Sequence, residues 1–199
     1  KGSTRPLKCS PQHLTYSDVK SIIPINDIDL SFSVVRDPLS RISSIYRVWR
    51  KILYKDLDMT TWLGAAQETY RRDPYAFDNH LRPQNEIVAP DAAVFKLEDG
   101  LDRVAAWLSE SLEAPSQIAT MPHANRSSPD GAQTAGLSRE AVSIVLDMYG
   151  ADYDRFGYAR PDPSHYPQVS GDRGRIERGR RLARPSPRRY LRNVANALL

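Results

Sequence analysis

An arginine and a serine lie where a buried strand is expected to run into a helix. The segment V-V-R-D-P-L-S-R-I-S-S spans residues 34–44 and contains Arg36 and Ser44. Free backbone N–H groups at a helix N-terminus carry partial positive charge, and a guanidinium can hold a phosphate through two hydrogen bonds. The segment therefore predicts a phosphate-binding site. The structural alternative is that Arg36 pairs with Asp37 or another carboxylate and that Ser44 is an ordinary helical residue.

The strand and the helix on either side of this arginine follow from hydrophobic periodicity. Residues 28–36 first alternate apolar and polar side chains and then become continuously apolar, which predicts a central parallel strand buried on both faces. Asp37 is expected to cap a helix that starts at Pro38, because apolar residues follow at helical spacing up to residue 53.

The rest of the chain repeats the order of strand and helix. We expect a helix over residues 60–72, a functional loop over 73–90, a strand over 93–98, a helix over 101–112, a mobile loop over 121–136 and a helix that Ser138 begins, with the compact part ending at Tyr158. This alternation predicts an α/β fold in which helices cover both faces of a parallel sheet.

The positive charge of the chain is concentrated at its C-terminal end. The 199 residues carry a net charge of +4, but residues 160–199 contain ten arginines against three acidic residues, about +7, which leaves about −3 for residues 1–159. Apolar residues are sparse over residues 160–186, so we expect disorder there, followed by a short amphipathic C-terminal helix.

Cysteine content and hydropathy exclude several classes of protein. The single cysteine, Cys9, excludes an intramolecular disulfide framework and a multi-cysteine metal site. No apolar run approaches the roughly 18 residues of a membrane span, so none is expected. The compartment stays open: cytoplasm for a bacterial protein, or the Golgi lumen for a eukaryotic protein with an N-terminal anchor outside this sequence.

Four segments in a fixed order resemble the family 2 (carbohydrate) sulfotransferases. They are R-D-P-x-x-R-x-x-S-x-Y from Arg36, D-N-H-L-R-P-Q at 78–84, V-F-K-L-E at 94–98 and D-Y-D-R-F-G-Y at 152–158. The resemblance covers residues 8–158. It implies a P-loop-kinase-like three-layer fold around a central parallel sheet, with a sulfotransferase domain over residues 1–159.

The resemblance also implies the reaction. A sulfuryl group would pass from 3′-phosphoadenosine 5′-phosphosulfate (PAPS) to a hydroxyl of a glycan-like acceptor, without a metal. Arg36 and Ser44 fall on the two ligands of the donor's 3′-phosphate. His13 lies 23 residues before Arg36, about where relatives place a histidine that deprotonates the acceptor, since neutral imidazole can take a proton near neutral pH. The alternative for His13 is a surface-loop histidine.

Four further residues receive roles from the same resemblance. His80 and Arg82 lie in an H-x-x-P-Q loop that resembles part of the acceptor-side wall, where Arg82 could meet an acidic sugar. The alternative is that His80 and Gln84 hold this loop together through hydrogen bonds to the backbone. Arg126 and Ser127 lie where relatives fold a segment over the nucleotide, although a solvated loop explains them as well.

The sequence departs from the family at its beginning. The P-K-x-G-x-T-S loop that binds the 5′-phosphosulfate in relatives is not found, so we expect a fragment or a truncated protein that lacks the first β-loop-α unit and whose activity is doubtful.

Two other readings remain open, and a third, a nucleotide kinase, is disfavoured. A nucleotide kinase would need a G-x-x-x-x-G-K-[ST] loop, and this motif does not occur. The two non-catalytic alternatives are a nucleotide-binding pseudoenzyme and a module that binds nucleic acid or another polyanion through its basic tail.

Overall fold

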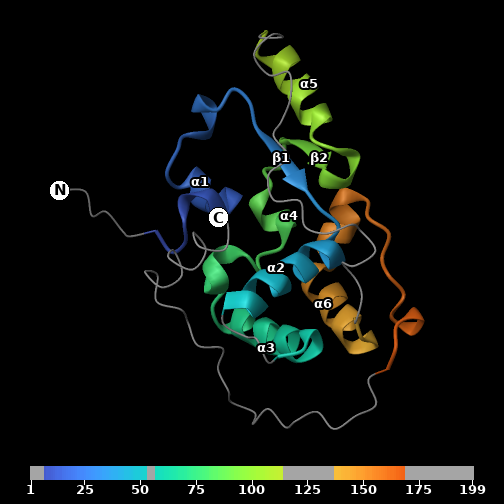
Figure 1. The fold of residues 1–199 in the computed structure, drawn as a ribbon. Helices are drawn as coiled ribbons and strands as arrows, with labels where there is room; N and C mark the ends of the chain where they lie inside the picture. Colours follow the sequence, from blue (N-terminus) through green and yellow to red (C-terminus); the bar gives the residue numbers. More distant parts are fainter. Residues whose placement is uncertain (1–6, 53–56, 114–136, 169–199) are drawn as a thin grey trace, which may run out of the picture.

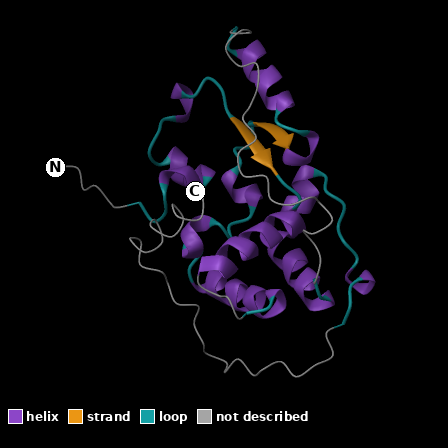
Figure 2. Cartoon of the chain, in the orientation of Figure 1, coloured by secondary structure: helices purple, strands orange, loops and turns teal. Residues whose placement is uncertain are grey.

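The computed structural model describes residues 7–52, 57–113 and 137–168 (Figure 1). The α-helices are α1 (Tyr16–Lys20), α2 (Pro38–Ile52), α3 (Met59–Arg72), α4 (Gln84–Ile87), α5 (Asp102–Ser111) and α6 (Arg139–Phe156). The strands are β1 (Phe32–Val35) and β2 (Ala93–Lys96). Short 3-10 helices cover Pro11–His13, Ile25–Asp27, Ala76–Asn79, Leu97–Asp99 and Pro163–His165. The fold is therefore mixed helix and strand, with helix predominating among these residues (Figure 2).

The two strands form a small parallel sheet. Phe32 pairs with Ala93, and the register continues to the pair of Val35 and Lys96. β1 is shorter than the predicted strand. Burial on both faces is also wrong for part of it, because Phe32 and Val34 are 40% and 39% exposed while Val35 is buried. Within the described residues β1 has one neighbouring strand, so it is not a central strand there.

A helical core lies beside the sheet, where α2, α3 and α6 pack together (Figure 1). The predicted spacing along α2 is confirmed, because its core residues recur every three or four positions: Leu39, Ile42, Tyr46 and Trp49 are buried. Aromatic rings join the helices edge to face or at a tilt, as in the pairs Trp49–Phe77 and Tyr46–Trp62, whose ring centroids lie 4.8 and 5.4 Å apart. The helices expected over 60–72, over 101–112 and after Ser138 correspond to α3, α5 and α6.

Side-chain caps fix where the main helices begin. Asp37 Oδ1 accepts a hydrogen bond from the backbone N–H of Ser40 at 2.8 Å, and α2 starts at Pro38, both as predicted. Ser138 Oγ accepts from the N–H of Ala141 at 3.1 Å at the start of α6, which confirms the second predicted cap.

The region predicted to be a loop over residues 73–90 contains two short helices, Ala76–Asn79 and α4. Three successive residues in it, Phe77, Asp78 and Asn79, have positive φ angles of 57°, 55° and 64°. A left-handed backbone is strained for non-glycine residues, least so for Asp and Asn, and such strain is concentrated at functional sites. This turn brings Asp78 and His80 against the segment that contains His13.

Residues 160–168, which were predicted to belong to the disordered tail, pack against α6. Arg160 makes an ion pair with Asp154 at 2.7 Å, Tyr166 packs on the helical core, and the N–H of Arg139 donates to the carbonyl of Pro167 at 2.9 Å. The disorder expected from residue 160 onward therefore does not extend to these nine residues. The rest of the tail and its expected C-terminal helix lie outside the described residues. None of the described helices is both long and apolar enough to cross a membrane.

Candidate functional site

The predicted phosphate-binding segment forms the junction between β1 and α2. Arg36 directly follows β1, Asp37 caps α2, and Ser44 lies on α2 almost two turns beyond its first residue. Arg36 and Ser44 are both half-buried. The N-terminus of α2 and a guanidinium thus occur together at the end of a parallel strand, where ligands of α/β proteins bind.

One amide side chain holds the backbone of Arg36 in place. Gln84 Oε1 accepts from the N–H of Arg36 at 2.9 Å, and Gln84 Nε2 donates to its carbonyl at 2.8 Å. Gln84 is buried, so these two hydrogen bonds are partly shielded from water. The role weighed for Gln84 was to hold its own loop together, but its side chain bonds to the backbone of Arg36, outside that loop.

A buried carboxylate supports Gln84 in turn. Asp152 is fully buried, and its two oxygens accept from the backbone N–H groups of Gln84 and Asn85 at 2.9 and 2.7 Å. Burial raises the pKa of Asp152, although both hydrogen bonds oppose the shift. Asp152 is not among the site residues predicted from the sequence, although the motif D-Y-D-R-F-G-Y begins with it.

The predicted catalytic histidine belongs to a cluster assembled from two distant segments. His13 Nδ1 lies 2.9 Å from Asp78 Oδ2, and the N–H and Oγ of Ser10 each donate to an Asp78 oxygen at 2.6 Å. Burial alone would raise the pKa of Asp78, but the Ser10 and His13 hydrogen bonds outweigh it and the net shift is downward. We call Ser10, His13, Asp78 and His80 the histidine cluster.

His80 completes this cluster. Its ring lies edge-on to that of His13, with 4.3 Å between the centroids, and its Nδ1 lies 2.7 Å from the carbonyl oxygen of Phe77. Burial and, secondly, the neighbouring His13 lower the pKa of His80 to about 4, so it is neutral near pH 7. Arg41 on α2 donates to the backbone carbonyl of His80 at 3.0 Å, which ties the cluster to the helix that follows Arg36.

The chemistry of the histidine cluster favours proton transfer over metal binding. Potential ligand atoms of His13, Asp78 and His80 lie within 4.8 Å of one another. However, Asp78 already accepts three hydrogen bonds, and both Nδ1 atoms have partners. At most the two Nε2 atoms could then bind a metal, fewer than the three protein ligands of a typical catalytic zinc site.

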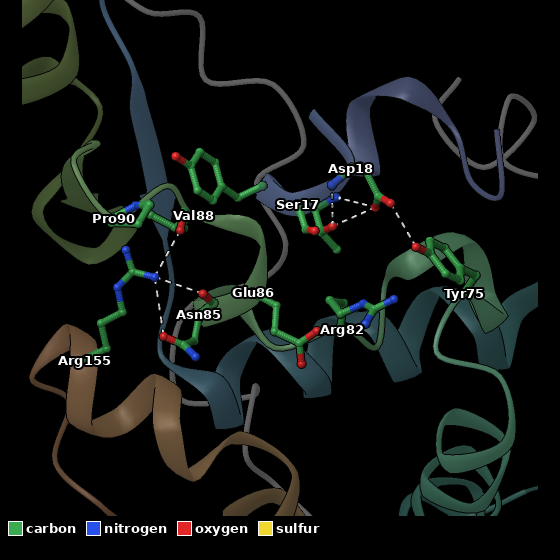
Figure 3. A pocket seen from close by; sticks show the side chains of 11 residues that line it. Ser17, Asp18, Tyr75, Arg82, Asn85, Glu86, Val88, Pro90 and Arg155 are labelled. Carbon is green, nitrogen blue, oxygen red and sulfur yellow. Dashed lines mark hydrogen bonds and ion pairs between the residues drawn. The ribbon is translucent and has the colours of Figure 1, made fainter. Parts of the chain in front are cut away.

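Arg82 lies in a pocket of about 460 Å³ between α1 and α4 (Figure 3). It pairs with Glu86 at 2.8 Å, stacks on the ring of Tyr75 and is almost buried. In the same pocket Asp18 accepts from Tyr75, and Arg155 donates to backbone carbonyls at the end of α4. The charged side chains of the pocket are thus already paired within the protein, which weakens the expectation that Arg82 meets an acidic sugar.

The structure brings the predicted site residues into two neighbouring groups. Arg36 and Ser44 belong to the junction, whereas His13 and His80 form the cluster, and Arg82 lies beside the cluster through its contact with Asn79. The remaining predicted residues, Arg126 and Ser127, lie outside the described residues. Ser10, Arg41, Asp78 and Asp152 were not predicted as site residues; the quoted family motifs contain the last three of these but did not show which atoms they contact.

Comparison with known proteins identifies the family. The sequence profile of the sulfotransferase family matches residues 15–159, well over half of the chain. The matched range includes Arg36, Ser44, His80 and Arg82, and His13 precedes it. Searches of curated proteins and of solved structures give no match. The family match agrees with the resemblance to family 2 and with the strand–helix junction at Arg36. The chain therefore belongs to the sulfotransferase family.

Proposed function

We propose that this protein transfers a sulfuryl group from PAPS to a hydroxyl of a glycan-like acceptor. Membership of the sulfotransferase family supports sulfuryl transfer in general and implies a hydroxyl-bearing acceptor. The more specific proposal rests on the position of Arg36 just before α2, where Gln84 holds its backbone through two hydrogen bonds. The three-layer, P-loop-kinase-like architecture belongs to the same proposal.

The donor's 3′-phosphate is assigned to Arg36, Ser44 and the N-terminus of α2. A guanidinium supplies two parallel N–H groups to a phosphate, and a serine hydroxyl adds another donor. Fixing the backbone of Arg36 in advance lowers the entropy that binding must overcome. The roles of Arg126 and Ser127 in covering the nucleotide remain predictions.

The acceptor is assigned to the pocket between α1 and α4. This pocket adjoins the histidine cluster, because Thr15 lines it and follows His13 by two residues, and because Arg82 contacts Asn79, which also donates to the His13 carbonyl. Since Arg82 and Glu86 are paired with each other, the pocket suits an uncharged hydroxyl-rich group better than a strongly acidic one.

In this proposal His13 is the general base. The acceptor oxygen attacks sulfur in line, its proton passes to His13, and the sulfur–oxygen bond to the donor breaks, so that adenosine 3′,5′-bisphosphate leaves with the electron pair. Catalysis comes from holding the reactants in position and from stabilising charge on the transferred group and on the leaving phosphate.

Calorimetry with adenosine 3′,5′-bisphosphate tests the donor assignment. Arg36→Ala should weaken binding by about 2–4 kcal/mol because it removes a charge-assisted double contact, and Ser44→Ala should weaken it by about 1 kcal/mol. Arg103→Ala is the matched control, since Arg103 is an exposed arginine on α5 that pairs with Asp99. Equal affinity in the wild type and in Arg36→Ala would refute the assignment.

A further inference from the structure

The hydrogen bonds around Asp78 determine which nitrogen of His13 carries the proton. The pKa of Asp78 is lowered, so its carboxylate is ionised near neutral pH and can only accept hydrogen bonds. His13 Nδ1, 2.9 Å from Asp78 Oδ2, must therefore be the donor. In the neutral ring this places the hydrogen on Nδ1 and leaves the lone pair on Nε2.

The same turn holds both the ring and the backbone of His13. Asn79 is almost fully buried, and its Nδ2 donates to the carbonyl of His13 at 2.8 Å. Asp78 and Asn79 hold these positions in a left-handed backbone, the conformation that Asp and Asn tolerate best among residues other than glycine. The turn thus orients His13 by two independent contacts that come from adjacent residues.

We propose that Asp78 is the positioning residue of an Asp78–His13 dyad, which fixes the Nδ1–H tautomer of His13 and leaves Nε2 as the atom that accepts the acceptor's proton. The proposal rests on the proposed function, since it assigns the base of the same reaction. The carboxylate also stabilises the imidazolium that forms when Nε2 takes the proton. The proton ends on Nε2, and the one on Nδ1 stays in the hydrogen bond to Asp78.

His80 has a complementary arrangement. Its Nδ1 faces a backbone carbonyl, which can only accept, so the hydrogen of neutral His80 is also on Nδ1 and its lone pair is on Nε2. Being uncharged near neutral pH, His80 places no positive charge beside His13 when His13 becomes protonated. Asp78 is the carboxylate that contacts His13, and His80 is the neutral neighbour of the His13 ring.

The surroundings of Asp78 predict how an asparagine would sit there. The backbone N–H of Ser10 faces the Oδ1 position and can only donate, so the amide oxygen of Asp78→Asn must occupy that position. The amide NH₂ then takes the Oδ2 position, where Ser10 Oγ can accept from it and where it faces His13 Nδ1. An NH₂ group in this place favours the opposite tautomer of His13, with the hydrogen on Nε2.

Nitrogen-15 NMR of the histidine rings tests this directly, without an acceptor. The chain has four histidines, so the His13 signals can be assigned by comparison with His13→Gln. At about pH 8, wild-type His13 should show the Nδ1–H pattern and Asp78→Asn the Nε2–H pattern. Asp18→Asn is the matched control, because Asp18 is a nearby, partly buried carboxylate that accepts from Thr15 and Tyr75.

Turnover supplies the second measurement, followed as release of bisphosphate from PAPS with a panel of neutral oligosaccharides. Asp78→Asn should lower kcat by about 10²-fold or more and change the affinity for bisphosphate less than twofold. Asp18→Asn should keep the Nδ1–H tautomer of His13. The proposal is overturned by an Nε2–H tautomer in the wild type, or by an Asp78→Asn protein that keeps wild-type kcat. Turnover is measured with a P-K-x-G-x-T-S loop and its β-loop-α unit restored, because this unit is expected to be missing. If the wild type with that unit shows no turnover, the sulfotransfer assignment fails, while the NMR result still decides whether Asp78 sets the tautomer of His13.

Discussion

The junction segment, residues 34–44, and the histidine cluster are built in opposite ways. The junction segment is continuous in sequence, and its strand end, cap and helix start are fixed by neighbouring residues such as Asp37 and Pro38. The histidine cluster joins residues that are 65 positions apart, through the contact between His13 and Asp78. A local site can be read from a motif, whereas a site made by distant segments needs the fold that brings them together.

The two regions nevertheless share one support, the segment from Phe77 to Asn85. Its first half supplies Asp78 and His80 to the cluster, and its second half supplies Gln84 to the backbone of Arg36. Arg41 connects them again, because it lies in the junction segment and donates to the carbonyl of His80. Variants in this shared support should therefore separate local from long-range contributions.

Asp152→Ala should have the largest effect on stability. Loss of the buried carboxylate leaves the N–H groups of Gln84 and Asn85 without acceptors, which should lower the unfolding free energy by about 3 kcal/mol in a denaturant titration. Asp154→Ala is the control on the same helix, where an exposed carboxylate pairs with Arg160 and the expected change is below about 1 kcal/mol. Similar effects in both variants would show that the shared segment does not depend on Asp152.

His80 should make stability depend on pH. Its pKa is about 4 in the folded protein and about 6.5 when unfolded, so the unfolded state binds more protons between these values. The contribution is fully present above about pH 6.5 and is lost as the pH falls toward 4, by up to about 3 kcal/mol. The difference in unfolding free energy between the wild type and His80→Gln should therefore change across this window. A difference that stays constant from pH 7 to about 4.5 would contradict a half-buried His80 that is neutral in the folded protein.

Gln84→Ala should have an intermediate effect. It removes two partly buried hydrogen bonds to the backbone of Arg36, which should lower the unfolding free energy by about 2 kcal/mol and weaken bisphosphate binding at the same time. Gln67→Ala is the matched control, since Gln67 donates to the exposed Asp147 and lies far along α3. If Gln84→Ala destabilises the fold without weakening bisphosphate binding, the junction segment orients Arg36 without help from α4.

The sequence predicted the junction segment well because its determinants are local. Asp37 at the cap, Pro38 at the first position and the apolar spacing of α2 act within a few residues of one another. The motifs that contain Arg36, Ser44 and His80 lie within the residues that the family match covers. The sequence could not show that Asp78 contacts His13 or that Asp152 holds Gln84, because a hydrogen bond between residues more than 60 positions apart leaves no periodic signal.

The burial of the sheet also could not be predicted from the sequence alone. The apolar run before Arg36 predicted a strand buried on both faces, yet Phe32 and Val34 are partly exposed. A run of apolar residues indicates that a strand is favoured. The burial of its two faces depends on which elements cover them, and those elements lie elsewhere in the chain.

Asp37→Ala tests the smallest expected effect and the most local one. The variant removes the acceptor for the Ser40 N–H, so the unfolding free energy should fall by about 1 kcal/mol, as for an ordinary N-cap. The backbone N–H of Asp37 donates to the Glu98 carboxylate. This hydrogen bond does not involve the Asp37 side chain and should remain in the variant. Asp58→Ala is the matched control, because Asp58 caps α3 through Thr61 at 3.0 Å, away from the junction segment.

The two caps should differ in their effect on ligand binding. Both variants should lose a similar amount of stability. Asp37 is adjacent to Arg36, so removing its negative charge should slightly increase the affinity for bisphosphate, whereas Asp58→Ala should leave that affinity unchanged. Asp37→Ser, which keeps a capping oxygen and removes the charge, should restore most of the stability and retain that affinity. A loss of more than about 2 kcal/mol in Asp37→Ala would mean that the start of α2 depends on long-range contacts, and the contrast between a local junction and a distant cluster would no longer hold.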